Sequence, residues 1–487
     1  MWRPSRLHSI TNVYLHRTRT QNFFLSLRSQ LHSSSSAIAS ATMNGIQDVS
    51  CAKHTQILPV DTAKLKNVAQ PIFQDGFLYD LRIKFDEEEE ALRNLKLAAK
   101  CLQTSNTPVA FPTETVYGLG ADATRSEAVK GIYAAKQRPA DNPLIVHFSS
   151  LSQLNSLLSG STIKNHEAVT AAVPSIYLPL IKKFWPGPLT IILPNPNTSP
   201  LAPEVTAGLD TFGARIPGNL LALLLIELLG KPIAAPSANA STKPSPTAAE
   251  HVLEDLNGRI EYIIDGGPCE VGVESTVVDG LSSPPAILRP GGISIDQLRE
   301  CSGWENVVVA YEDVSMKKGQ PRAPGMKYRH YSPKAKVFLY ETGTDRPKHE
   351  TLEKQGFRTL GFIHTRYWKS NLHDDSNDHC RTAGGEKSAR TNHAADRFSA
   401  LVPDLFVQRP ELKHKCVDRP GGQVTYWEIK IGESASDVAR NLFWALRELD
   451  RKGCEVICVE GIGSESSDVA DAVMNRLRKA AEVQFDK

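Results

Sequence analysis

Two prolines between Lys136 and His147 constrain the fold of this chain more than any other local feature. Pro139 and Pro143 fix the backbone, so a helix that precedes them must end before they are reached. The apolar run at 144–146 then predicts a short buried strand that closes on the histidine. A helix, a rigid turn and a buried strand in succession are typical of an α/β domain.

The same turn carries two cations, Lys136 and Arg138. On an extended chain or a tight turn, residues at alternate positions face a similar direction. Lysine supplies a point charge and arginine a planar fork, and the pair suits an anionic group such as a phosphate. A solvated surface pair is the alternative, and surface cations are far commoner than ligands.

Length and composition exclude few functions. A chain of 487 residues corresponds to about two to four domains. Lys and Arg number 56 against 54 Asp and Glu, so bulk charge does not indicate nucleic-acid binding, and any basic patch must be local. No apolar run reaches the length of a membrane span, so we expect no membrane contact. The eight cysteines lack zinc-module spacing, and we expect reduced thiols and no protein-bound metal.

The N-terminal residues 1–47 differ in kind from the rest. They contain five arginines and no Asp or Glu, and a serine run covers 33–36. This composition is typical of an organelle transit peptide, which predicts a mitochondrial or plastid protein; a disordered tail is the alternative. A form that starts at Met43 would remain in the cytosol.

Between residues 83 and 300, short apolar runs alternate irregularly with helical patterns and turn residues. The pattern predicts one α/β domain with a twisted mixed sheet and flanking helices. Within it, the stretch 112–120 places two hydroxyls around Glu114 and two glycines after a strand, which suits a polar small molecule. P-loop and dinucleotide spacings are absent. Glu114 is either a base or metal ligand, or a structural acceptor.

A linker and a second domain follow. In the linker, residues 301–335, cations interleave with Tyr328 and Tyr331, which suits a polyphosphate with a base or a single nucleic-acid strand. The linker is therefore a lid or, alternatively, a plain tether. Residues 336–487 predict a smaller Rossmann-like α/β domain. Its polar stretch 366–396 is predicted to be a disordered insertion.

Several separate motifs resemble the YrdC family of threonylcarbamoyl-AMP synthases. They are the stretches 112–120, 136–139, 184–190, 235–239 and 272–276, and the linker motif 323–333. Because the linker and a second domain are present, the chain is similar to the long form of the family. The resemblance implies a YrdC-like first domain.

The resemblance also implies a reaction. Enzymes of this family join L-threonine, bicarbonate or CO2 and ATP, and release pyrophosphate, so the expected class is nucleotidyltransferase. The product serves N6-threonylcarbamoyladenosine formation at position 37 of tRNAs that read ANN codons. Expected partners are tRNA or a downstream tRNA threonylcarbamoyl transferase. Such a step needs positioning and charge neutralisation more than a covalent nucleophile. Mg2+ would arrive with ATP and need no dedicated carboxylate.

Site residues are implied by the same motifs. Lys136 and Arg138 would be catalytic and contact the nucleotide. Residues expected around threonine are Thr115, His147, Arg215, Ala235 and Ser275. Residues expected around the nucleotide are Asn142, Thr211, Ser237, Asn239, Ser245, Arg289 and Tyr331. A core histidine, an ion-paired arginine, and serines in turns or helix caps are the structural alternatives.

Two other functions remain open. A double-stranded RNA or tRNA-binding module without synthase activity would use the basic concave face of a YrdC fold, and it needs no threonine pocket. A sugar-phosphate lyase like dihydroxybutanone-phosphate synthase would need an acidic metal cluster. The one acidic run in the chain, residues 87–90, lies outside the motifs.

Overall fold

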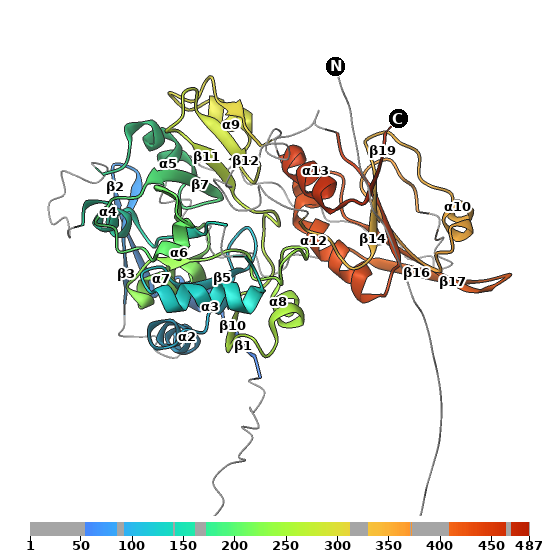
Figure 1. The fold of residues 1–487 in the computed structure, drawn as a ribbon, viewed down its shortest axis with the longest axis horizontal. Coiled ribbons are helices and arrows are strands. Elements are labelled where there is room, and N and C mark those ends of the chain that lie inside the picture. The colour runs from blue at the N-terminus through green and yellow to red at the C-terminus, as the bar shows by residue number, and fades with distance from the viewer. Residues whose placement is uncertain are drawn as a thin grey trace, which may run out of the picture. The chain divides into compact units, whose positions relative to one another are not determined.

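The computed structural model describes residues 54–84, 92–139, 142–160, 172–311, 330–370, 372, 409–463 and 469–486. The predicted transit peptide, the Met43 start, linker residues 312–329 and most of the 366–396 stretch lie outside these ranges. All described residues belong to one compact unit, 51–487. Two large sheets within it give the mixed α/β architecture that the sequence predicts (Figure 1).

The first sheet contains eleven strands among the described residues, in the order β1-β10-β4-β5-β9-β6-β8-β7-β11-β12-β13. In chain order the strands are β1 (Gln56–Pro59), β4 (Val109–Phe111), β5 (Gly118–Asp122), β6 (Ile145–His147), β7 (Leu189–Pro194), β8 (Thr211–Arg215), β9 (Ile233–Ala234), β10 (Tyr262–Asp265), β11 (Thr276–Asp279), β12 (Ala286–Arg289) and β13 (Val308–Val309). Parallel and antiparallel pairs are mixed, since β6 pairs in parallel with β8 and antiparallel with β9. The strands are short, so many strand ends and loops meet near the middle of the sheet.

Helices and one hairpin surround this sheet. They are α1 (Thr62–Leu65), α2 (Arg93–Thr104), α3 (Ser126–Lys136), α4 (Leu151–Ser159), α5 (Leu178–Phe184), α6 (Pro203–Thr206), α7 (Leu220–Leu229), α8 (Ala249–Leu256), α9 (Ile295–Arg299) and the hairpin of β2 (Ala69–Gln74) and β3 (Phe77–Ile83). Helix α7 is apolar at nine of its ten positions and is buried, as expected of a helix without a polar face. Asn219 caps its first turn and Gly230, at φ 69°, ends it.

The sheet extends beyond the predicted boundaries of 83 and 300. Strand β1 pairs in parallel with β10, and β13 pairs in parallel with β12. Both are short edge strands with mostly exposed side chains, so neither has an apolar alternation that sequence reasoning can detect. Helix α3 begins at Ser126, whose hydroxyl donates to Glu204 at 2.7 Å.

The second sheet has six strands among the described residues, in the order β16-β17-β15-β18-β14-β19. The elements are β14 (Lys336–Tyr340), α10 (His349–Lys354), β15 (Thr359–His364), β16 (Leu412–Arg419), β17 (Gly422–Lys430), α12 (Ala435–Arg451), β18 (Val456–Glu460), α13 (Val469–Ala480) and β19 (Val483–Phe485). All described pairs are parallel except β16 with β17.

Successive residues of β14 serve opposite faces of this sheet. Val337 and Leu339 join the apolar cluster under α12 and α13, while Phe338 and Tyr340 join a second cluster that includes α10. Helices on both faces make the domain doubly wound, in agreement with the Rossmann-like prediction. Trp368, in the stretch predicted to be disordered, packs against Tyr340 with ring centroids 5.3 Å apart, so the described start of that stretch is ordered.

Candidate active site

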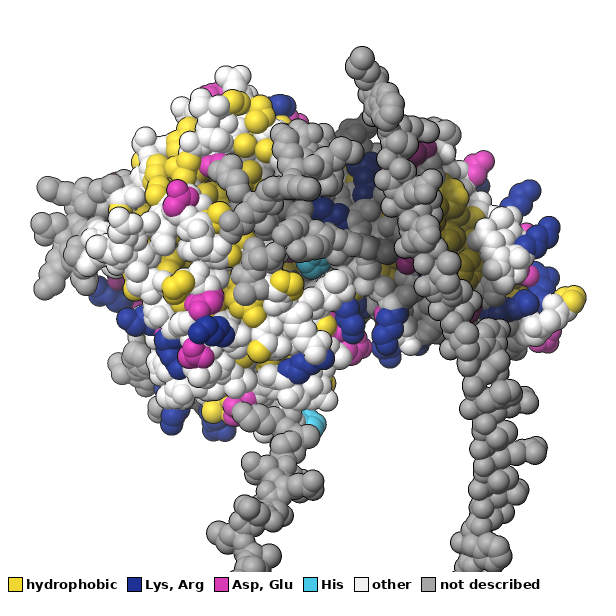
Figure 2. Space-filling view, viewed as in Figure 1, with side chains coloured by type: hydrophobic (Ala, Val, Ile, Leu, Met, Phe, Trp, Pro, Cys, Tyr) yellow, Lys and Arg dark blue, Asp and Glu magenta, His cyan; other side chains and the backbone are white. Residues whose placement is uncertain are grey.

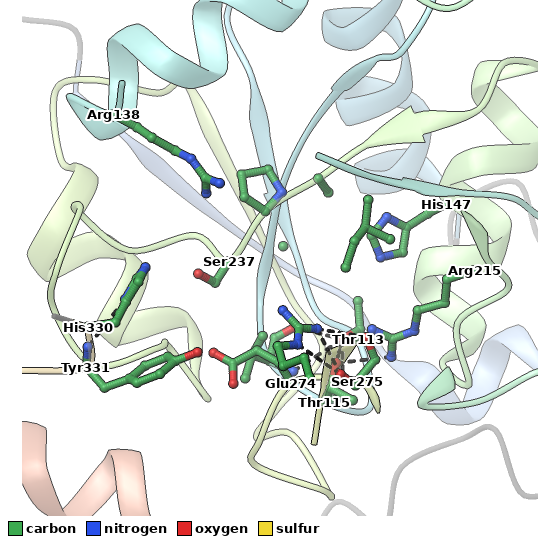
Figure 3. A pocket seen from close by; sticks show the side chains of 16 residues that line it. Thr113, Thr115, Arg138, His147, Arg215, Ser237, Glu274, Ser275, His330 and Tyr331 are labelled. Atoms are coloured by element: carbon green, nitrogen blue, oxygen red, sulfur yellow. Dashed lines mark hydrogen bonds between the residues drawn. The ribbon is translucent and has the colours of Figure 1, made fainter. Parts of the chain in front are cut away.

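A cavity forms where the loops and strand ends of the first sheet meet the linker (Figure 3). Its lining residues are Thr113, Thr115, Val116, Gly118, Arg138, Ile145, His147, Arg215, Ala235, Pro236, Ser237, Glu274, Ser275, Arg289, His330 and Tyr331. The empty space, counted to its open mouth and including solvent there, is about 570 Å³. Nine of the predicted site residues therefore converge on one cavity.

Arg215, at the end of β8, is held by three groups. Its Nη2 donates to Glu114 Oε1 at 2.6 Å and to Thr115 Oγ1 at 3.0 Å, and its Nε donates to the Gly187 carbonyl at 3.2 Å. Both members of the ion pair are buried. Within the described part of the chain Nη1 makes no hydrogen bond, so this end of the guanidinium can bind a carboxylate. Glu114 is thus the structural acceptor that the sequence left as one alternative.

His147 ends β6 and lies beside Arg215 in the cavity wall (Figure 3). Burial, and next the charge of Arg215, lower the pKa of His147 to about 3. The ring is therefore neutral at physiological pH. Nδ1 is buried and has no hydrogen-bond partner among the described residues, which leaves it available to a ligand.

Arg289 and Ser275 form a second polar wall. Arg289 Nη2 donates to the Ser275 carbonyl at 2.8 Å and to its Oγ at 3.0 Å. The Ser275 hydroxyl also lies 2.8 Å from Thr190 Oγ1 on β7. Strand β11 begins one residue after the serine, so the Ser275 hydroxyl stands at the strand end facing the cavity.

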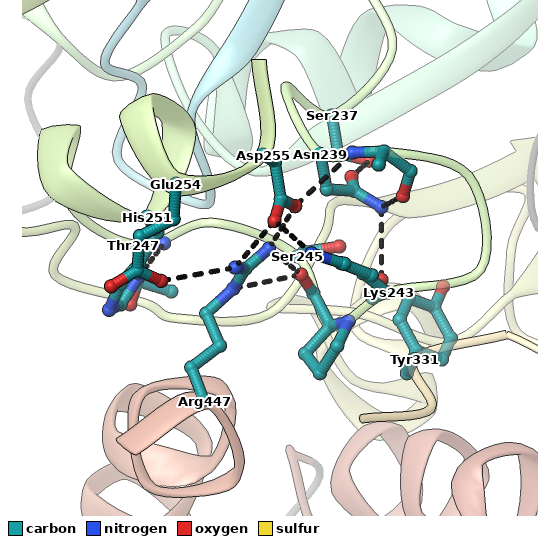
Figure 4. A network of polar contacts seen from close by, with 12 residues as sticks. Ser237, Asn239, Lys243, Ser245, Thr247, His251, Glu254, Asp255, Tyr331 and Arg447 are labelled. Carbon is teal, nitrogen blue, oxygen red and sulfur yellow. Dashed lines mark hydrogen bonds and ion pairs between the residues drawn. The ribbon is translucent and has the colours of Figure 1, made fainter. Parts of the chain in front are cut away.

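The turn after β9 presents Ser237, whose hydroxyl donates to Asn239 Oδ1 at 2.5 Å. Asn239, which was expected around the nucleotide, does not line the cavity. It is fully buried and its Nδ2 donates to two carbonyls of the same loop, so it orders this turn (Figure 4). Figure 3 shows Arg138 directed toward the same part of the cavity from the end of α3.

Lys136 differs from the prediction, because it does not line the cavity. It is the last residue of α3, and Gln137 follows in the left-handed conformation at φ 52°, so the two cations point to different places. Its ammonium donates to the carbonyls of Ser237 and Asn239. Burial, and next the charge of Arg138, hold the pKa of Lys136 well below its usual range. The side chain braces the turn beneath Ser237.

Three further predicted nucleotide residues do not line the cavity. Thr211 begins β8 and lies four residues from Arg215, which is about 13 Å along a strand. Asn142 is buried, and its carbonyl accepts from Tyr133 at 3.1 Å. Ser245 was a candidate for a helix cap, but α8 begins at 249 and its hydroxyl instead donates to Glu274 at 2.5 Å.

The linker contributes His330 and Tyr331 to the cavity wall. Tyr331 has the left-handed φ of 66° and is buried, with its ring stacked on Phe443 of α12 at a centroid distance of 5.2 Å. The Ser332 N–H donates to the Thr242 carbonyl at 2.8 Å. Of the predicted linker residues, Tyr331 is therefore at the cavity, while residues 312–329 lie outside the described part of the chain.

Sequence reasoning missed three polar residues of the cavity, namely Thr113, Glu274 and His330. Glu274 stands inside the motif 272–276, where one acid among small and hydroxyl side chains was an available indication. Burial raises the pKa of Glu274, but Arg476, Arg289 and Ser245 together bring it to about 2. The carboxylate is therefore ionised at neutral pH.

Within the described ranges, no three His, Cys, Asp or Glu side chains gather in a group that could hold a metal ion. None of the described helices is both long and apolar enough to cross a membrane. On the face drawn in Figure 2, Lys and Arg side chains are interspersed with Asp and Glu.

Arginines, hydroxyls and a neutral imidazole thus converge on one α/β cavity, an arrangement typical of enzymes that position and neutralise anionic substrates. Two family models match the chain. The Sua5–YciO–YrdC model, described as "Telomere recombination", matches residues 102–291, and the model "Threonylcarbamoyl-AMP synthase, C-terminal domain" matches residues 293–482.

The alignments with known relatives extend over most of this chain and most of each relative. The threonylcarbamoyl-AMP synthase of Schizosaccharomyces pombe is 44% identical over 421 residues, which is 82% of this chain and 90% of the relative. That of Pyrococcus abyssi is 40% identical over 77% of this chain and 90% of the relative. The crystal structure of P. abyssi Sua5 complexed with L-threonine superposes with a TM-score of 0.61 at 34% identity, over 89% of this chain and 100% of that one.

The chain therefore belongs to the threonylcarbamoyl-AMP synthase family, in the long form with a C-terminal domain. Its enzyme class is nucleotidyltransferase, and its function is in threonylcarbamoyl modification of tRNA. These findings confirm the family, fold and enzyme class expected from the motifs.

Proposed function

We propose that the cavity binds L-threonine, bicarbonate and ATP together and forms threonylcarbamoyl-AMP from them. The observation that carries this assignment is the division of the cavity into two sides. Figure 3 shows Arg215 and His147 on one side and Arg138, His330 and Tyr331 on the other. One side suits an amino acid and the other a nucleotide.

Threonine would lie against Arg215, with its carboxylate on Nη1. The contacts of Nη2 and Nε with Glu114, Thr115 and Gly187 pre-orient the guanidinium, so little rotamer entropy is lost on binding. Neutral His147 would accept a hydrogen bond at Nδ1 from the amine or hydroxyl of the substrate. Thr115, Ser275 and Ala235 would complete this side.

The nucleotide would lie between Arg138, the Ser237 turn and Tyr331. Arg138 and Arg289 would neutralise phosphate charge, and the ring of Tyr331 offers an aromatic surface to the base. Mg2+ would enter as part of the ATP substrate.

The amine of threonine takes up bicarbonate as a carbamate with loss of water, and the carbamate oxygen then attacks the α-phosphorus. The bond from that phosphorus to the bridging oxygen breaks, and pyrophosphate leaves with the electron pair.

Such a step depends on charge neutralisation and alignment, to which each cation in the wall contributes. A separate transferase would then move the threonylcarbamoyl group of the product to adenosine 37 of ANN-reading tRNAs.

Isothermal titration in the absence of RNA tests the assignment. We expect saturable binding heat for both threonine and ATP. Arg215→Ala should reduce the heat from threonine, and Arg138→Ala should reduce the heat from ATP. Binding of RNA with no heat from either small molecule would favour an RNA-binding module instead.

A further inference from the structure

A buried arginine of the C-terminal domain contacts the wall of the cavity. Arg476 on α13 donates from Nε to Glu274 Oε2 at 3.1 Å, and its Nη2 lies 3.0 Å from the same oxygen. Its Nη1 donates to the Pro290 carbonyl at 2.5 Å, next to Arg289. The side chain of Arg476 is fully buried, and that of Glu274 is 9% exposed. A surface ion pair of this geometry would contribute little, but a buried pair fixes both partners.

Glu274 is the anionic member of the cavity wall. Its second carboxylate oxygen accepts from Ser245, so both oxygens are held. The cavity has to admit a polyphosphate, and an unpaired carboxylate there would repel it. Without Arg476, the charge of Glu274 would act on Arg289 and cancel part of the attraction that this cation offers to the nucleotide.

We propose that Arg476 is a positioning residue for the synthase reaction, supplied to the active site by the C-terminal domain. It neutralises and orients Glu274, so that the cavity keeps a net attraction for the nucleotide. The inference rests on the proposed function, because it assumes that the bound anion is ATP.

The same arginine also contacts the linker. Its guanidinium lies 5.8 Å from the centroid of the Tyr331 ring, which is the range of a cation–π contact. Figure 3 shows the Tyr331 hydroxyl directed toward the Glu274 carboxylate. One side chain therefore holds two cavity residues that come from different segments of the chain.

Other contacts between α12 and the first domain provide a comparison. Arg447 pairs with Asp255 at 2.7 Å and donates to the Pro244 carbonyl (Figure 4). Arg440 donates to the Glu270 carbonyl at 2.8 Å. These three partners do not line the cavity. Replacing Arg447 should therefore affect only the docking of the two domains, whereas replacing Arg476 should affect both the docking and the charge of the cavity.

The test compares Arg476→Ala with Arg478→Ala in the full-length enzyme. Arg478 is a matched control two residues away on α13, with a side chain 52% exposed and paired with Glu341 at 2.8 Å. We expect Arg476→Ala to raise the KM for ATP about tenfold or more, with a smaller change in kcat. Arg478→Ala should stay within about threefold of the wild-type ATP KM, because exposed pairs contribute little. Arg447→Ala breaks a buried pair and should lower stability, but the ATP KM of the folded enzyme should stay within about threefold of wild type. Arg476→Lys should recover part of the loss.

A second variant separates charge from folding. Glu274→Gln combined with Arg476→Met removes both charges, and buried pairs replaced together are often tolerated. We expect its ATP KM to be at least about threefold lower than that of Arg476→Ala, because no uncompensated carboxylate remains in the cavity wall. If Arg476→Ala does not fold, Arg476→Met is the single variant for this comparison. The inference is overturned if Arg476→Ala matches Arg478→Ala, if Arg447→Ala shows the same ATP defect, or if the double variant is as impaired as Arg476→Ala. Wild-type enzyme that makes no product would instead contradict the proposed function.

Discussion

The ammonium of Lys136 lies 2.6 Å from the backbone carbonyl oxygen of Asn239. The contact joins the end of α3 to the turn that presents Ser237, and it is buried beneath the cavity wall rather than exposed within it. Two cations that are neighbours in sequence therefore have different tasks. Lys136 shapes the turn, and Arg138 faces the ligand.

Replacement of these two cations by Met should separate the two tasks. Lys136→Met leaves buried carbonyls of Ser237 and Asn239 without donors, so we expect it to lower the free energy of unfolding by about 2–4 kcal/mol and to impair activity. Arg138→Met should weaken ATP binding by about 1.5–3 kcal/mol and change stability much less. Urea unfolding and ATP titration measure the two effects. Equal stability of both variants would show that Lys136 is not a brace.

Arg215→Lys should reduce affinity for threonine while leaving ATP binding nearly unchanged. Lysine keeps the positive charge but cannot contact Glu114, Thr115 and a carboxylate with a planar fork. We expect the binding free energy of threonine to weaken by about 1.5–3 kcal/mol, so that its KM rises roughly 10- to 100-fold. The KM for ATP in the same preparation is the internal control. A parallel rise in both constants would indicate general damage and count against a threonine-specific role.

Buried neutral histidines should make the protein less stable in acid. Burial, followed by the charge of Arg215, lowers the pKa of His147 to about 3, against about 6.5 in an unfolded chain. Because the folded pKa is the lower one, the unfolded state binds more protons between these values, and stability falls as pH falls through that window. On going from pH 7 to pH 5, His147→Asn should lose about 2 kcal/mol less stability than wild type.

The control for this measurement is His414→Asn, because His414 is exposed on β16. Urea unfolding at the two pH values should give the same pH-dependent loss for this variant as for wild type. If His147→Asn also shows the wild-type loss, the histidine is not buried in its neutral form.

Local patterns predicted those parts of the fold that depend on neighbouring residues. Two prolines and the apolar run at 144–146 predicted strand β6. The divergence of Lys136 and Arg138 could not be predicted in this way. It follows from the left-handed conformation of Gln137 between them, which residues other than glycine seldom adopt.

The candidate site shows the same limit. The motifs correctly indicated nine residues of the cavity. They did not indicate the pair of Glu274 and Arg476, which are separated by 202 positions in the sequence. No local pattern links an acid in a strand-end motif to an arginine on the last described helix. Their relationship follows from the packing of α12 and α13 against the first domain, where Val116, Val273 and Tyr331 join the core of the second.

The N-terminal composition gives a prediction about location. A fluorescent protein fused to the C-terminus of the full-length chain should appear in mitochondria or plastids, because residues 1–47 hold five arginines and no acid. The same fusion started at Met43 should remain in the cytosol. Confocal imaging with organelle markers distinguishes the two. Identical distributions would mean that the leader does not direct import.

The central claim is that one cavity joins threonine, bicarbonate and ATP. The most direct measurement is mass spectrometry of the product after incubation of the purified full-length protein with all three substrates and Mg2+, using 13C-bicarbonate. We predict threonylcarbamoyl-AMP carrying one 13C, released with one equivalent of pyrophosphate, and loss of this product in Arg138→Ala and Arg215→Ala. Pyrophosphate release without threonine, or an adenylate that lacks the 13C label, would contradict the account.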